Sequence, residues 1–156
     1  MKIAVIGAGG IGGYVGGRLA EAGEDVTLIA RGAHLEALRK NGLRIETPGA
    51  EASPEIRAVA HAKDVGPVDL IISAVKMTDA RDAAEMMPDM LADHTRVLTL
   101  QNGIDGPSVA ASVVGGDRVA AGTIFIASYI KEPGVIICPG GMQMMNVHRM
   151  ASKTNS

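Results

Sequence analysis

Six residues near the start of the sequence constrain the fold more than any other feature. They run Gly7-Ala8-Gly9-Gly10-Ile11-Gly12 and have the spacing G-x-G-x-x-G. An apolar run, residues 3–6, comes directly before them, and Ile11, Val15 and Leu19 follow at intervals of four. This order predicts a buried strand, a tight glycine turn and then a helix with one apolar face.

The glycines of this pattern predict a dinucleotide-binding turn, because each answers a separate requirement. Gly7 allows the tight turn, Gly9 lets the backbone approach a pyrophosphate without a Cβ in the way, and Gly12 lets helix and strand pack closely. The start of the helix then offers free N–H groups and the positive end of its dipole to the phosphates. A glycine-rich turn that only packs tightly is the alternative.

Three further glycines, Gly13, Gly16 and Gly17, lie inside the predicted helix. Each costs about 1 kcal/mol relative to alanine in a helix interior. Close approach of this helix to the sheet or to a partner explains them without any ligand. The dinucleotide hypothesis therefore rests on the three glycines of the pattern alone.

Strands and helices alternate along the remaining sequence, with short connections between them. Strands are expected at residues 3–6, 26–30, 43–46, 56–60, 68–75, 96–100 and 118–121; helices at 11–22, 33–40, 78–91 and 107–114; and an antiparallel hairpin at 125–130 and 135–138. With 156 residues, the chain has the length of one domain. We predict an α/β fold of the Rossmann type, with a doubly wound, mostly parallel sheet and a C-terminal antiparallel hairpin.

The end of the second predicted strand indicates which dinucleotide is preferred. NAD sites usually place Asp or Glu there, to hold the ribose 2′-hydroxyl. Here the strand is followed by Arg31, and the nearest acid, Asp25, lies at its other end. An arginine can bind a 2′-phosphate through its two-pronged guanidinium, whereas a carboxylate would repel it. Arg31 therefore favours NADP(H), and an ordinary solvated arginine is the alternative.

Two polar segments follow other predicted strands, at the edge of the sheet where such folds bind their ligands. Lys76 could orient a substrate carboxylate or a cofactor ribose, and Asn102 could donate a hydrogen bond to a ribose, a nicotinamide or a substrate. Each has a structural alternative. Lys76 could be surface charge at a helix start, and Asn102-Gly103 is a turn-forming pair in its own right.

Composition excludes several other classes of function. The net charge of −2 gives no field that would gather nucleic acid or an anionic membrane. A single cysteine, Cys138, cannot form an internal disulfide, and no histidine is spaced to share a metal with it. The apolar run at residues 3–6 is too short for a signal peptide or a membrane span. We therefore expect a cytoplasmic protein with a small-molecule partner and no metal site.

Five short segments together resemble one known family, that of ketopantoate reductase (2-dehydropantoate 2-reductase). They are residues 2–12 (KIAVIGAGGIG), 27–32 (TLIARG), 74–76 (AVK), 100–103 (LQNG) and 121–123 (AGT). The resemblance implies NADPH-dependent reduction of a 2-oxo acid to a 2-hydroxy acid, on the route to pantothenate and coenzyme A. It also implies that Arg31 binds the 2′-phosphate and that Lys76 and Asn102 face the cofactor and substrate.

The resemblance covers residues 1–141, which we expect to form the NADP-binding domain, and 142–156 are expected to be a divergent tail. Family members are about twice as long, and their second, helical domain holds the lysine that acts as acid and the glutamate that holds the substrate. No catalytic residue is therefore expected in this chain. A truncated or frame-shifted gene product is expected, and a divergent last strand with a frayed terminus is the alternative.

Two functional hypotheses follow. In the first, the chain is the cofactor domain of an NADPH-dependent oxidoreductase, whose candidate partners are a second copy of itself or a separate chain that provides the substrate domain. In the second, it is a non-catalytic NADP(H)-binding module or a gene remnant. Without a positioned acid, the alkoxide that develops during reduction would lack its proton donor.

Overall fold

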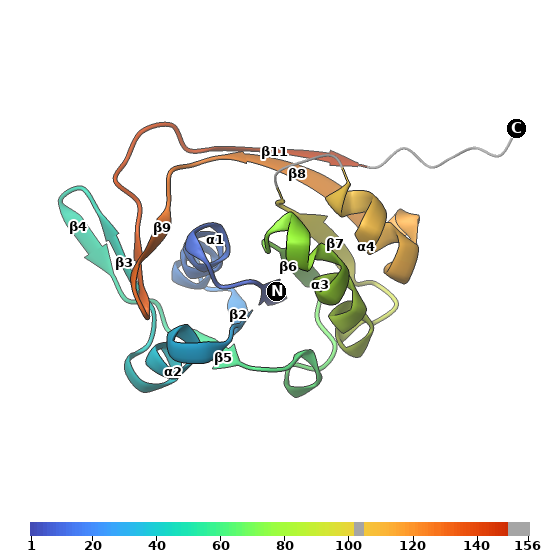
Figure 1. The fold of residues 1–156 in the computed structure, drawn as a ribbon, viewed down its shortest axis with the longest axis horizontal. Coiled ribbons are helices and arrows are strands. Elements are labelled where there is room, and N and C mark those ends of the chain that lie inside the picture. Colours follow the sequence, from blue (N-terminus) through green and yellow to red (C-terminus); the bar gives the residue numbers. More distant parts are fainter. Residues whose placement is uncertain (102–104, 150–156) are drawn as a thin grey trace, which may run out of the picture.

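A computed structural model describes residues 1–101 and 105–149, and Figure 1 shows how they are arranged. The main sheet has the strand order β11-β8-β7-β6-β1-β2-β5. These strands are β1 (Lys2–Ile6), β2 (Asp25–Ile29), β5 (Arg57–Val59), β6 (Leu70–Ser73), β7 (Arg96–Thr99), β8 (Val119–Phe125) and β11 (Met144–Arg149). All of them pair in parallel except β11, which is antiparallel to β8. The predicted doubly wound, mostly parallel sheet is confirmed.

Both faces of the main sheet are covered by helices, as a parallel sheet requires. The helices are α1 (Gly10–Glu21), α2 (Gly32–Asn41), α3 (Ala80–Met86) and α4 (Gly106–Val114), and short 3₁₀ turns form η1 (Ala62–Asp64), η2 (Met77–Asp79), η3 (Met87–Met90) and η4 (Gly116–Arg118). Alternate residues of β1 point to opposite faces. Ile3 and Val5 join the core beneath α1 and α2, whereas Ala4 and Ile6 join the core beneath α3 and α4.

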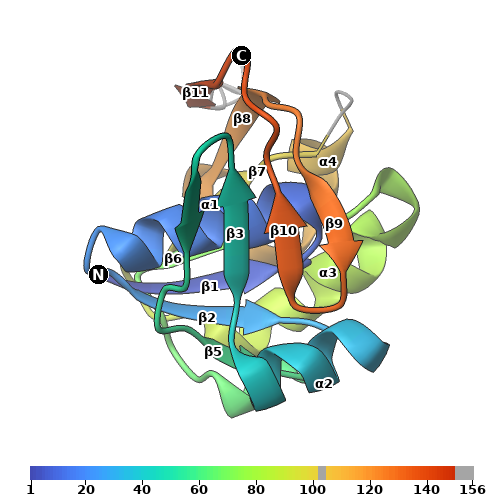
Figure 2. The same cartoon turned by 90° about the vertical axis from the view of Figure 1, so that its left-hand side faces the viewer.

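A second, smaller sheet packs on the side of α1 that faces away from the main sheet, as Figure 2 shows. Its strands are β3 (Arg44–Thr47), β4 (Ala50–Ala52), β9 (Tyr129–Glu132) and β10 (Val135–Ile137), in the order β4-β3-β10-β9. The predicted antiparallel hairpin is confirmed as β9 and β10, but its first strand begins at Tyr129 rather than at residue 125, because Phe125 ends β8. It does not extend the main sheet, however, because β10 pairs in parallel with β3.

The glycines inside α1 let this helix fit between the two sheets. A Cβ on Gly16 would lie 2.8 Å from Cδ2 of Leu28 on β2, and one on Gly13 would lie 3.0 Å from Cγ1 of Ile136 on β10. A Cβ on Gly17 would overlap the side chain of Ile45 on β3. The expectation that these glycines reflect close packing rather than ligand binding is confirmed.

Two segments differ most from the sequence-based expectation. The single helix expected at residues 78–91 is divided into η2, α3 and η3, and Pro88 lies in the first turn of η3. The segment assigned to a divergent tail contains β11, whose residues are all exposed. Among the helices in the described ranges, none is both long enough and apolar enough to cross a membrane.

Candidate functional site

A cleft of about 570 Å³ opens at the carboxyl ends of β1, β2 and β6. The strand order reverses between β1 and β6, since β2 and β5 lie on one side of this pair and β7 and β8 on the other. Open α/β sheets bind their ligands in the crevice at such a reversal, and the volume lies within the range of small-molecule sites. The sheet topology therefore makes this cleft the candidate site.

The glycine turn after β1 forms one wall of the cleft, through Gly7, Ala8 and Gly9. Gly7 has a φ of +92°, a conformation that other residues rarely adopt. Its N–H donates a hydrogen bond of 3.2 Å to the carbonyl oxygen of Ile29, which ties the turn to β2. A Cβ on Gly9 would meet nothing within 4 Å, so this backbone is open to a ligand.

The other residues of the pattern are placed for packing. A Cβ on Gly12 would overlap the carbonyl oxygen of Gly7, so the helix start rests directly on the turn. A Cβ on Gly10 would overlap the carbonyl oxygen of Ser128, whose hydroxyl donates a 2.9 Å hydrogen bond to the Gly10 carbonyl. Ile11 packs against the core beneath α1. Of the six residues in the glycine pattern, only Gly7, Ala8 and Gly9 line the cleft.

The first turn of α1 adds a positive potential next to the glycine turn. It contains no acidic residue, and no side chain caps the N–H groups of the helix start. Such N–H groups lack partners within the helix, and the helix dipole is positive at this end. An anionic group bound beside Gly9 would therefore be stabilised.

Arg31 lies at the end of β2, as predicted, and its side chain lines the same cleft. It occupies the N-cap position of α2, with its side chain 89% exposed. Its Nη2 lies 3.2 Å from Oδ2 of Asp79, a residue of η2 on the opposite side of the cleft. Asp25 lies at the first position of β2, away from the cleft, so no acid occupies the tip of this strand.

Lys76 follows β6 and also lines the cleft, where its side chain is exposed. It precedes η2 and accepts a 2.9 Å hydrogen bond from the Asp79 N–H through its backbone carbonyl. Asn102, the other predicted crevice residue, lies outside the described residues. The fold thus brings the glycine turn, Arg31 and Lys76 to one cleft from three separate strand ends.

His34 lines the cleft and was not predicted from the sequence. Its Nδ1 accepts a 3.0 Å hydrogen bond from the N–H of Gly134, which requires this nitrogen to be unprotonated. Its Nε2 lies 2.8 Å from the carbonyl oxygen of Ala8, so Nε2 is the nitrogen that donates. Burial lowers the pKa of His34, although the bond to Ala8 opposes the shift. The neutral ring thus links the glycine turn to the β9–β10 turn.

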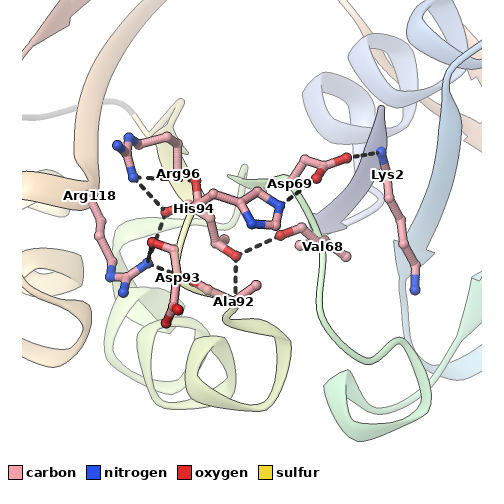
Figure 3. Close-up of polar contacts among 9 residues, drawn as sticks. Lys2, Val68, Asp69, Ala92, Asp93, His94, Arg96 and Arg118 are labelled. Atoms are coloured by element: carbon pink, nitrogen blue, oxygen red, sulfur yellow. Dashed lines mark hydrogen bonds and ion pairs between the residues drawn. The ribbon is translucent and has the colours of Figure 1, made fainter.

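A second polar network lies at the amino ends of the strands, away from the cleft (Figure 3). The Asp69 carboxylate accepts 2.7 Å hydrogen bonds from the backbone N–H of Lys2 and from Nε2 of His94, and these lower its pKa. The buried Thr95 hydroxyl donates to the carbonyl of Val68 and accepts from the N–H of Ala92. These bonds hold the starts of β1, β6 and β7 together, so we assign the network a structural role.

Metal and cysteine chemistry have no candidate site in the part of the chain that the structure describes. No group of three His, Cys, Asp or Glu side chains is placed to hold a metal ion within residues 1–101 and 105–149. Cys138 is fully buried beside β10, in the core beneath α1.

Sequence comparison matches the chain to a known family. A family-wide sequence profile described as "Ketopantoate reductase PanE/ApbA" matches residues 3–151. A 2-dehydropantoate 2-reductase from Mesorhizobium japonicum is 36% identical, over 87% of this chain and 48% of the relative. The chain therefore spans about half the length of the curated relatives it matches.

Solved structures agree with the sequence match. The crystal structure of 2-dehydropantoate 2-reductase from Porphyromonas gingivalis W83 has a TM-score of 0.85 and 33% identity, over 94% of this chain and 54% of that one. A ternary structure of D-mandelate dehydrogenase with NADH and anilino(oxo)acetate has a TM-score of 0.84 and 26% identity, over 94% of this chain and 47% of that one. On these matches, the chain belongs to the ketopantoate reductase family of oxidoreductases.

Proposed function

We propose that this chain is the NADP(H)-binding part of a reductase of the 2-dehydropantoate 2-reductase type. The observation that supports it most is the meeting of Gly9, Arg31 and Lys76 around one cleft at the reversal of the strand order. These residues come from the ends of three strands that are far apart in the sequence. A glycine turn that served packing alone would not need two cations facing the same opening.

In this proposal each residue has a separate task. The pyrophosphate lies against Gly9 and the start of α1, where the absent Cβ leaves room and the helix dipole favours negative charge. Arg31 pairs with the adenosine 2′-phosphate, for which its guanidinium has the right shape and charge. Lys76 orients a ribose or a substrate carboxylate, and Asn102 remains a predicted partner at the same edge. The bound nicotinamide supplies the hydride.

The preference for NADP(H) rests on Arg31 and on the absence of an acid at the tip of β2. An acid there would hold the 2′-hydroxyl of NAD(H) and repel a phosphate. The D-mandelate dehydrogenase that resembles this chain was solved with NADH, so the fold by itself does not exclude NAD(H). The preference must therefore come from side chains at the adenosine end of the cleft.

We further propose that a second, helical domain completes the site, either as a separate chain or as a continuation of the polypeptide. The family resemblance assigns the proton-donating lysine and the substrate-holding glutamate to such a domain. Exposed apolar side chains on β8 and β11, including Phe125, Met144 and Val147, would give it a surface to cover. A second copy of this chain is the other candidate for that surface. The substrate class is a small 2-oxo acid.

The proposal is tested by mixing the purified chain with NADPH and then with ketopantoate. We expect NADPH to bind, measured by the change in its fluorescence, and ketopantoate to be reduced only when the helical half of a relative is added. A chain that binds neither NADPH nor NADH would refute the proposal. Binding without turnover, even with the second domain present, would favour the non-catalytic binding module.

A further inference from the structure

The ion pair between Arg31 and Asp79 spans the adenosine end of the cleft. Arg31 comes from the start of α2 and Asp79 from η2, so the pair joins two separate walls. The distance from Nη2 to Oδ2 is 3.2 Å. Within the described ranges, this is the one hydrogen bond that the Arg31 side chain makes. The guanidinium that we assign to the 2′-phosphate thus already holds an anion.

The Asp79 carboxylate is not needed to start the helix that follows it. Asp79 is the N-cap residue of α3, where an aspartate usually accepts a hydrogen bond from an N–H of the first turn. Here the side chain makes no such bond. Its position is set by the backbone instead, because its N–H donates to the carbonyl of Lys76. The carboxylate is therefore directed at the cleft, and its contact is with Arg31.

The neighbouring charges do not duplicate this contact. Asp82 lies one turn further along and lines the cleft, but forms no ion pair with Arg31 in the described structure. Arg81 points away, since it pairs with Glu85. Lys76 shares the cleft with Asp79. Asp79 is thus the acid placed against the proposed phosphate ligand.

We propose that Asp79 sets how strongly the site prefers NADP(H) over NAD(H), by competing with the 2′-phosphate for the Arg31 guanidinium. This inference rests on the proposed role of Arg31. A phosphate that pairs with Arg31 must displace or share the Asp79 carboxylate, and it meets a like charge there. The 2′-hydroxyl of NAD(H) meets no repulsion and can donate to the same carboxylate. Asp79 thus weakens the binding of NADP(H) and favours the binding of NAD(H). It does so from η2, whereas NAD sites usually place such an acid at the tip of the second strand.

The test is the ratio of the dissociation constants for NADH and NADPH in Asp79→Asn. Removing an exposed ion pair of this kind is expected to tighten NADPH binding by about two- to fivefold. NADH binding should stay unchanged or weaken, so the ratio increases. Asp82→Asn removes the same charge one turn away, where no ion pair with Arg31 forms, and is the matched control, which should change the ratio less than Asp79→Asn does. The variant Asp79→Glu keeps the charge and should restore the wild-type ratio.

A double variant shows whether Asp79 acts through Arg31. In an Arg31→Ala background, Asp79→Asn should no longer increase the preference for NADPH. The inference is overturned if Asp79→Asn leaves the ratio unchanged, or if Asp82→Asn changes it equally, while Arg31→Ala still abolishes the preference. If Arg31→Ala itself has no effect on the ratio, the proposed role of Arg31 fails first. Equal free energies of unfolding for all variants would exclude a loss of folding as the cause.

Discussion

Replacing Gly9 by alanine should separate ligand binding from folding. The added Cβ would meet no atom of the protein within 4 Å, and the backbone of Gly9 has a φ of −70° and a ψ of −164°, which alanine adopts without strain. Alanine is a somewhat poorer N-cap than glycine, but it restricts the unfolded chain more, so the two effects oppose each other. We expect the free energy of unfolding to stay within about 1 kcal/mol of the wild type.

The same substitution should weaken binding of the dinucleotide. The Cβ would occupy the space through which the pyrophosphate approaches the backbone. Losing one hydrogen bond to a charged group costs about 1.5–3 kcal/mol, which corresponds to at least tenfold weaker binding. NADPH and NADH should be affected alike, because they share the pyrophosphate. Fluorescence titration of both cofactors measures the affinity, and urea unfolding measures the stability.

Gly12→Ala is the matched control for this experiment. Its Cβ would overlap the carbonyl oxygen of Gly7, which is backbone that cannot rotate away. We expect a loss of about 1–3 kcal/mol in the free energy of unfolding, as is typical of overpacked sites. If Gly9→Ala binds NADPH as tightly as the wild type, the pyrophosphate does not lie against Gly9 and the reasoning is wrong.

Two further predictions concern stability. His34 is neutral in the fold, and burial lowers its pKa below the ordinary value of 6.5. Its contribution to the free energy of unfolding should therefore be complete above pH 6.5 and be lost as the pH falls toward the lower pKa of the folded state. Unfolding measured across this pH range should show a smaller loss of stability in His34→Gln than in the wild type. Thr95→Val removes a hydroxyl that is hydrogen-bonded to the backbone of Val68 and Ala92. The free energy of unfolding, measured with urea, should fall by about 1–3 kcal/mol for each backbone group left unpaired. An NADPH affinity unchanged from the wild type would confirm that this network is separate from the cleft.

The main sheet could be predicted from the sequence because its signals are local. The strand, glycine turn and helix at the start lie within about twenty residues, and most of the parallel strands contain a short apolar run. The carboxyl ends of parallel strands meet at one edge of a sheet. The sequence therefore also predicted that Arg31 and Lys76 lie at the same edge, where both line the cleft. The glycines inside α1 were correctly attributed to close packing.

The second sheet as a whole could not be predicted, because the pairing of β3 with β10, which joins its two hairpins, is not local. Its strands β3 and β10 come from opposite halves of the sequence, and β4 and β10 have three residues each. Every residue of the strand β11 is exposed, so the strand has no alternation of buried and exposed residues to reveal it. It forms by pairing with the edge of β8.

The cleft residues that sequence reasoning missed are defined by distance in space. His34 belongs to α2, yet it binds the turn after β1 and the turn between β9 and β10. Asp79 is an ordinary acid near the start of a predicted helix, and its contact with Arg31 joins residues 48 positions apart. Neither residue belongs to a motif, so only the assembled fold shows that they share the site.

Titration of the purified chain with NADPH and with NADH, in the wild type and in Arg31→Ala, tests the central claim most directly. The wild type should bind NADPH more tightly than NADH by about tenfold, the value of one charge-assisted contact to a phosphate. Arg31→Ala should lose this preference and bind NADH as before. Equal affinities in the wild type, or a preference that survives the loss of Arg31, would contradict the account.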